Sequence, residues 1–149
     1  MSPRRPSSVI VVDTNIILSI ALGLRSRPVL NVVRAKRMLV TSARARDEAR
    51  GVAGGMGSGA ELAIVDDLFE HITVADEHLY AAHLEAAAEV LRTAVASRNG
   101  SVTDAHVLAL AWAVDGDIWS HDRDFAGTGW PSWSSANLRA SLDSEDAAA

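Results

Sequence analysis

The sequence predicts an α/β fold, a three-layer α/β/α sandwich with a mostly parallel central sheet. Two observations support this fold class. Short runs such as "VIVVD" (residues 9–13) and "MLVTS" (38–42) are mostly apolar, as expected for strands buried on both faces of a parallel sheet. Along the chain these runs alternate with longer stretches of helical periodicity, and that alternation is typical of parallel sheets.

The predicted elements follow in order along the chain. Strands are expected at 9–13, 38–42, 72–74 and 118–121, with a brief edge strand near Trp133. Helices are expected at about 16–22, 28–37, 43–56 and 60–71, and in two pieces over about 75–97. Thr103 is a good N-cap for a further helix, and a last helix precedes the C-terminal tail.

Length and composition predict one globular domain over residues 1–149, with residues 1–8 and 143–149 as flexible ends. Hydrophobic residues make up 48% of the chain and charged residues 22%, which excludes a disordered or fibrous protein. No apolar run approaches the roughly 18 residues of a membrane span, and the start "MSPRRPSS" is not followed by a signal-peptide pattern. We therefore expect a cytoplasmic protein with no membrane partner.

The net charge of −5 hides an uneven distribution. Residues 1–50 carry ten Arg and Lys against three acids, whereas residues 51–149 carry four against sixteen. The planar guanidinium of arginine binds phosphate well, so a polyanionic partner for the first third is one interpretation. An ordinary solvated surface is the other. The chain has no cysteine, which excludes disulfides, thiolate metal sites and thiol nucleophiles.

Several acids are expected at one edge of the sheet. In open parallel sheets, ligands bind at the carboxyl ends of the strands. Asp13 ends the first strand, and Asp122 directly follows the strand at 118–121. Asp104 lies in the first turn of the helix that leads to that strand, and crossover helices run antiparallel to the strands. These three acids are therefore predicted to converge.

Two further acids extend this set. Glu48 lies beside the apolar side of its helix, whereas Asp47 shares its side with arginines and is expected to face water. Asp124 lies on the same side as Asp122 if "SHDRDF" is extended, and it could bind a metal directly, act through water or cap a turn. Each acid alone also has a structural explanation as a turn former, a helix-terminal charge or a solvated group.

A cluster of carboxylates favours a bound cation. Carboxylates placed together raise one another's pKa unless a cation neutralises them. Oxygen ligands without cysteine or a histidine pair suit Mg²⁺ or Mn²⁺, which commonly bridge to a substrate phosphate. One or two such ions can lower the pKa of a bound water and stabilise the leaving oxygen of a phosphodiester. The sequence therefore predicts metal-assisted hydrolysis of nucleic acid.

With these residues in place, the chain resembles the PIN-domain ribonucleases, a group that includes the VapC-type toxins of bacterial toxin–antitoxin modules. The segments that carry the resemblance are "VIVVDTNIIL", "SARARDEA", "TDAHVLALA" and "IWSHDRDF". By this resemblance the catalytic and metal-binding positions are Asp13, Glu48, Asp104 and Asp122, with Asp124 as an accessory metal ligand. Polar positions beside the acids are matched by Thr14 or Asn15 and by Ser120, which would hydrogen-bond and orient them.

The resemblance implies a parallel α/β/α sandwich, dependence on Mg²⁺ or Mn²⁺, an RNA substrate and a homodimer, and a toxin would also have a cognate antitoxin. Arg44 and Arg46 are candidates for contacting the RNA backbone. Two alternatives stay open: a catalytically silent PIN-like module that binds RNA or protein, and a small-molecule phosphohydrolase. The histidines show no metal-binding spacing, so we interpret His106 and His121 as structural or solvent-facing.

Overall fold

A computed structural model describes residues 4–23, 26–94, 102–121 and 124–148 of the chain. Its strands are β1 (Val9–Val12), β2 (Met38–Ser42), β3 (Thr73–Ala75), β4 (Asp117–Trp119) and β5 (Ser132–Trp133). Its α-helices are α1 (Thr14–Ala21), α2 (Ser26–Arg34), α3 (Ala43–Gly54), α4 (Ala60–Leu68), α5 (Glu77–Tyr80), α6 (Leu84–Thr93), α7 (Ala105–Val114) and α8 (Ser135–Ala148). Two 3₁₀ turns are η1 (Ala81–His83) and η2 (Val102–Asp104).

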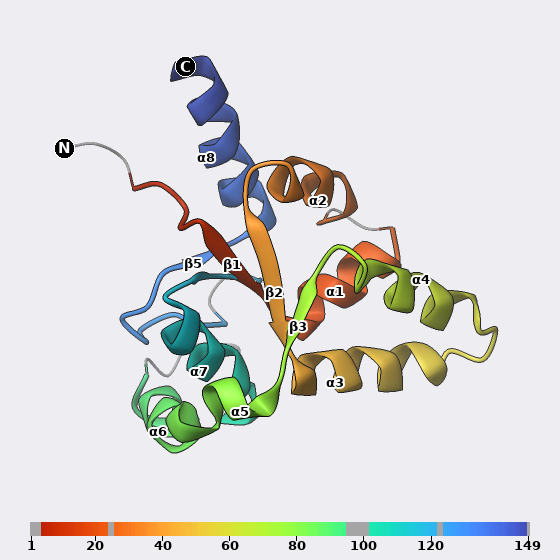
Figure 1. Cartoon of the computed structure of the whole chain (residues 1–149), viewed down its shortest axis with the longest axis horizontal. Helices are drawn as coiled ribbons and strands as arrows, with labels where there is room; N and C mark the ends of the chain where they lie inside the picture. Colours follow the sequence, from red (N-terminus) through yellow and green to blue (C-terminus); the bar gives the residue numbers. More distant parts are fainter. Residues whose placement is uncertain (1–3, 24–25, 95–101, 122–123, 149) are drawn as a thin grey trace.

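The strands form one sheet in the order β3-β2-β1-β4-β5, and every neighbouring pair is parallel (Figure 1). The chain first builds outward from β1 to β2 and β3, and then returns to the other side of β1 with β4 and β5. The order of the strands thus reverses at β1 and β4, which is where open parallel sheets bind ligands. The predicted parallel α/β/α sandwich is confirmed.

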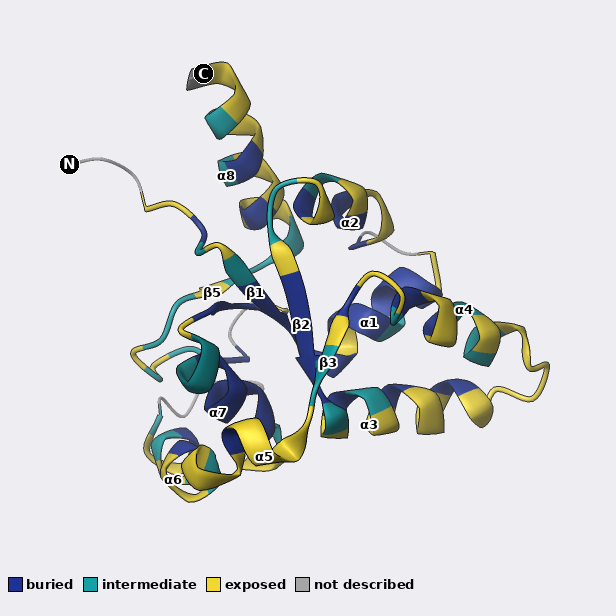
Figure 2. Ribbon diagram, viewed as in Figure 1, coloured by how far each residue is buried: buried dark blue, intermediate teal, exposed yellow. Residues whose placement is uncertain are grey.

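Helices cover both faces of the sheet because the strand side chains alternate between them. Ile10 and Val12 pack with α1, α2, α4 and α8 on one face, whereas Val11 packs with α5, α6 and α7 on the other. Figure 2 shows most of β1 and most of β2 buried in the middle, with the exposed faces of the helices outside. Among the described residues no single helix is long and apolar enough to cross a membrane. The helices α1 and α2, which meet at a sharp bend, together reach the length and apolar composition of a membrane span, and only by these two criteria.

Two local expectations differ from the structure, and a third is not tested by it. Thr103 is not the N-cap of α7, because η2 carries the chain one residue further and puts Asp104 in that position. The strand expected at 118–121 is β4 at Asp117–Trp119, so Ser120 and His121 follow it. The break expected after these helical pieces, at residues 97–101, lies outside the described residues.

The described residues of the expected flexible C-terminal tail belong to helix α8, and basic side chains ahead of β2 contact this helix. Helix α8 runs to Ala148. Lys36 Nζ donates to the carbonyl oxygen of Leu142 over 2.9 Å and pairs with Asp146 Oδ1 at 2.6 Å. Arg37 forms an ion pair with Glu145. These contacts hold the last turns of α8 near the amino edge of the sheet.

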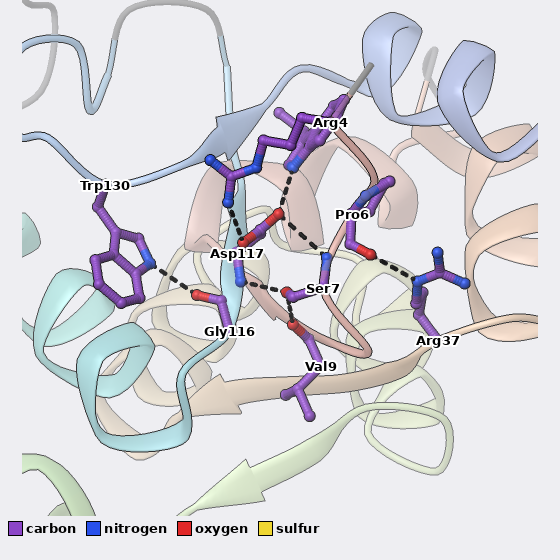
Figure 3. Close-up of polar contacts among 9 residues, drawn as sticks. Arg4, Pro6, Ser7, Val9, Arg37, Gly116, Asp117 and Trp130 are labelled. Atoms are coloured by element: carbon purple, nitrogen blue, oxygen red, sulfur yellow. Dashed lines mark hydrogen bonds and ion pairs between the residues drawn. The ribbon is translucent and has the colours of Figure 1, made fainter. Parts of the chain in front are cut away.

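The segment before β1 is also anchored, by the buried carboxylate of Asp117 at the start of β4 (Figure 3). Asp117 Oδ1 accepts from Arg4 Nη2 at 3.0 Å, and Oδ2 accepts from the Ser7 backbone N–H at 3.2 Å and from Trp133 Nε1 at 2.8 Å. The Asp117 N–H in turn donates to Ser7 Oγ at 2.7 Å. Gly116, just before Asp117, lets the start of β4 lie close to β1, because a Cβ at Gly116 would lie 2.8 Å from the carbonyl oxygen of Val9.

Replacing Asp117 by Ala is expected to lower the free energy of unfolding by about 2–3 kcal/mol, because it leaves the Ser7 N–H and Trp133 Nε1 without their acceptor. Urea unfolding followed by circular dichroism measures this loss. Asp143→Ala, at an exposed position of α8, is the control and should change stability by less than about 0.5 kcal/mol. Equal stability of the two variants would contradict the anchoring role.

Candidate functional site

Asp13 lies directly after β1, at the point where the strand order reverses. Its backbone N–H donates to the carbonyl oxygen of Trp119 at the end of β4, over 3.1 Å. Its carbonyl oxygen accepts from the backbone N–H groups of Ile16 and Ile17, which begins α1. The residue is only 3% exposed. Both strand pairing and helix initiation therefore fix the Asp13 backbone at the carboxyl edge of the sheet.

The carboxyl of Asp13 is surrounded by other acids. Burial raises the pKa of Asp13 to about 8, and the negative charges of Asp104, Asp124 and Glu48 add to this rise. The backbone N–H of Thr14 opposes it by hydrogen-bonding the carboxylate. Three acids from separate parts of the chain are therefore close enough to Asp13 to affect its ionisation.

The three neighbours reach this edge from different elements. Asp104 occupies the N-cap position of α7 without capping it through its side chain, and it is partly buried. Asp124 is 8% exposed and follows the segment after β4. Asp122, which the sequence also predicts to bind metal, lies outside the described residues.

Glu48 approaches from the second turn of α3. That helix begins after Ser42, whose hydroxyl oxygen accepts from the Ala45 N–H at 2.9 Å. Glu48 Oε2 accepts from Thr14 Oγ1 at 3.0 Å, so the residue after Asp13 contacts the Glu48 carboxylate directly. Asp47 is exposed and pairs with Arg46, as the sequence indicated for this neighbour.

His106 belongs to this group, although sequence reasoning interpreted it as structural or solvent-facing. It lies in α7, is 1% exposed, and its Nδ1 is 2.7 Å from Ser42 Oγ. Its Nε2 is 3.5 Å from Glu48 Oε1. Burial and the nearby Arg44 lower the pKa of His106 to about 4, so the ring is neutral near pH 7. The available signal was its position two residues after Asp104, on a helix that is apolar on its other sides.

The other predicted polar residues differ in their positions. Asn15 is exposed, unlike Thr14 before it. Ser120 is buried, and its hydroxyl donates to the carbonyl oxygen of His121 at 3.2 Å. Arg44 pairs with Glu77 at 3.7 Å on the surface of α3, close enough to His106 to affect its pKa.

The donor set fits a hard divalent cation. Asp13 is a buried carboxylate whose charged form is disfavoured by its acidic neighbours, and a cation would remove that penalty. Within the described ranges, however, no three His, Asp or Glu side chains are already arranged to hold a metal ion. Within those ranges, the acids are therefore near one another without forming a closed coordination shell.

A cavity lies elsewhere in the described part of the chain. It has a volume of about 810 Å³ and is bordered by the segment before β1, β5 and α8. Its lining includes Arg4, Arg5, Trp133, Asn137 and Glu145. These residues surround the amino edge of the sheet, opposite the acids, so this cavity is not a substrate pocket for them.

The raised pKa of Asp13 predicts how the stability of the metal-free protein depends on pH. A carboxyl that titrates near 3.8 when unfolded and near 8 when folded stabilises the fold while protonated, below pH 3.8, and this contribution is lost as the pH rises to about 8. Asp13→Asn removes the buried charge. Because one pKa unit equals about 1.4 kcal/mol, this variant should be at least about 1 kcal/mol more stable than the wild type at pH 8 in EDTA.

Thermal unfolding of the two proteins between pH 5 and pH 8 measures this difference, which should narrow toward pH 5. Asp47→Asn is the matched control, because Asp47 is exposed beside the acids. A wild type that is more stable than Asp13→Asn at pH 8 in EDTA would contradict the prediction.

Comparisons with known proteins bear on the family and the fold. The sequence model of the PIN-domain family matches residues 11–143. A search of curated proteins finds no match.

Two similar solved structures are VapBC2 from Rickettsia felis, bound to a DNA fragment from the promoter, and VapBC-1 from nontypeable Haemophilus influenzae. The first is 12% identical with a TM-score of 0.66, over 85% of this chain and 98% of the other. The second is 17% identical with a TM-score of 0.66, over 86% and 98%. At these identities the structures are evidence for the fold, and the match over residues 11–143 identifies the family. The chain belongs to the PIN-domain family.

Proposed function

We propose that the chain is a metal-dependent endoribonuclease that hydrolyses RNA phosphodiester bonds at the carboxyl edge of the sheet. PIN domains are generally nucleases that use a divalent metal, and this chain belongs to that family. The observation that carries the proposal is the buried Asp13 carboxyl, whose pKa is raised to about 8 beside Asp104, Asp124 and Glu48. A polar cluster this costly to ionise is characteristic of functional sites.

In this proposal Mg²⁺ or Mn²⁺ is held by Asp13, Glu48, Asp104 and Asp122, with Asp124 as an accessory ligand. When bound, the cation supplies Lewis-acid activation of the attacking water and stabilises the leaving oxygen of the phosphodiester. Thr14 Oγ1 keeps the Glu48 carboxylate turned toward Asp13 through its 3.0 Å hydrogen bond. We propose that Asn15 and Ser120 orient neighbouring acids through similar hydrogen bonds.

Basic residues near the acids favour a polyanionic substrate. Arg44 and Arg46 on α3 are partly exposed, and their present partners Glu77 and Asp47 are surface groups. Such exposed ion pairs contribute little to stability, so the guanidinium groups can exchange partners for phosphate at small cost. We propose that both contact the RNA backbone.

A protein partner is proposed from the likeness to the VapBC structures. On that basis the chain would be the toxin of a toxin–antitoxin module, cytoplasmic, dimeric and inhibited by a cognate antitoxin. Purified chain mixed with the product of a small adjacent reading frame, followed by size-exclusion chromatography, tests this part separately from the nuclease activity.

Replacing Asp13 or Asp104 by Asn is expected to reduce RNA cleavage in Mn²⁺ by more than about 100-fold, because metal charge stabilisation is worth several kcal/mol in the transition state. Cleavage of a fluorescent RNA measures the rate, and circular dichroism checks the fold. Asp47→Asn is the control and should keep the wild-type rate. Wild-type rates in both Asp13→Asn and Asp104→Asn would exclude the proposed site.

A catalytically silent module is the second candidate, favoured because no three acids or histidines of the described residues already form a metal site. Thermal unfolding with and without Mn²⁺ separates the two candidates. The nuclease proposal expects Mn²⁺ to raise the melting temperature of the wild type by several degrees, and not that of Asp13→Asn. The silent module expects no shift in either protein. A panel of nucleotide monophosphates beside RNA tests for a small-molecule phosphohydrolase.

A further inference from the structure

His106 is a buried polar residue beside the acids that the proposed metal site does not use. Its ring lies between α7 and the start of α3, with Nδ1 2.7 Å from Ser42 Oγ. Its Nε2 is fully buried and has no hydrogen-bond partner among the described residues. Glu48 Oε1 lies 3.5 Å from this Nε2. The ring therefore connects the N-cap of α3 to a carboxylate of the candidate site.

The contacts of Ser42 determine which ring nitrogen carries the proton. The Ser42 oxygen already accepts a hydrogen bond from the Ala45 N–H at 2.9 Å, and its own O–H proton needs an acceptor in a position that is 1% exposed. His106 Nδ1 is that acceptor if it is unprotonated. A neutral ring then carries its proton on Nε2, on the side of Glu48.

The opposite tautomer is less well satisfied. A proton on Nδ1 would be donated to Ser42 Oγ, and the buried Ser42 hydroxyl would lose its acceptor. It would also place a lone pair of Nε2 opposite the Glu48 carboxylate at 3.5 Å. Direct binding of a metal by Nε2 requires this second tautomer. The hydrogen-bond pattern of the described residues thus favours donation from Nε2 over metal ligation.

We propose that His106 is a positioning residue, which directs its Nε2–H at Glu48 Oε1 and holds this carboxylate at the acid cluster. Thr14 Oγ1 donates to the other oxygen, Oε2, at 3.0 Å. His106 and Thr14 therefore each lie next to one oxygen of the same carboxylate. Glu48 needs such support because its side chain is long and 43% exposed. This inference rests on the proposed function, in which Glu48 is a metal ligand.

The wild-type protein allows a direct test of the tautomer. Long-range ¹H–¹⁵N correlation spectra of the uniformly ¹⁵N-labelled chain at pH 7 distinguish protonated from unprotonated ring nitrogens. The proposal expects His106 with a protonated Nε2 and an unprotonated Nδ1. A protonated Nδ1, alone or in an imidazolium, overturns it. This measurement requires neither a variant nor a metal.

Metal affinity tests the consequence. Glutamine can place an amide donor near the position of Nε2, whereas asparagine reaches only the position of Nδ1 and its contact with Ser42. Calorimetric titration with Mn²⁺ should therefore show affinity within about 3-fold of wild type for His106→Gln and about 10-fold weaker for His106→Asn, a typical effect of removing a group that orients a metal ligand. His78→Asn, at an exposed histidine, is the matched control and should bind as the wild type does.

A double-mutant cycle separates positioning from a general structural role. If His106 acts through Glu48, the effect of His106→Asn on Mn²⁺ affinity should disappear in a Glu48→Gln background. A loss that persists there, or no loss in His106→Asn alone, overturns the inference. If His106→Asn does not fold, His106→Gln and the tautomer measurement decide.

The outcomes also distinguish this inference from the proposed function. Mn²⁺ binding that Asp13→Asn abolishes and His106→Asn leaves unchanged contradicts the role of His106 and supports the metal site. A wild type that binds no Mn²⁺ overturns both.

Discussion

The pairing of β1 with β4 is the constraint on which the rest of the structure depends. These strands are far apart in sequence, yet Val12 lies opposite Trp119 in a parallel register. The hydrogen bond from the Asp13 N–H to the Trp119 carbonyl oxygen extends this pairing by one residue. Because the register fixes where each strand ends, it also fixes which polar residues meet at the carboxyl edge. A shift by one residue would turn Ile10 and Val12 away from the α1 and α8 face.

At the carboxyl edge of the sheet, the requirements of the fold and of the proposed site oppose each other. The sheet buries Asp13 deeply, and the acids around it make its charged form unfavourable. The free-energy cost of burying the Asp13 carboxyl is offset by the aliphatic core on both sides of the sheet. This core also leaves the backbone around Asp13 little freedom to relax. Ser42 and Thr14 are part of this arrangement, because each combines a backbone role at a helix start with a side-chain contact to the site.

The alternation of apolar runs and helices was enough to predict the parallel sheet, because burial on both faces leaves a clear signal in "VIVVD" and "MLVTS". The end of the first apolar run also predicted that Asp13 follows β1. Glu48, expected on the side of its helix that faces the sheet, is 43% exposed there and contacts Thr14. The contacts of His106 could not be predicted, because its partners, Ser42 and Glu48, are distant in sequence and no local pattern joins them. The contacts of helix α8 could not be predicted for a similar reason. Lys36 and Arg37 reach α8 from before β2, and only the folded chain brings them there.

The anchoring of both chain ends has a practical consequence. Arg4 is bound to Asp117, and the last turns of α8 are bound beside Lys36 and Arg37, so both ends of the described part of the chain lie at the amino edge of the sheet (Figure 1). The acids lie at the opposite edge. A fluorescent protein, an affinity tag or a surface linker attached at either end would therefore leave the acidic edge open to solvent. Immobilisation on a surface through either end would therefore leave this edge facing away from the surface.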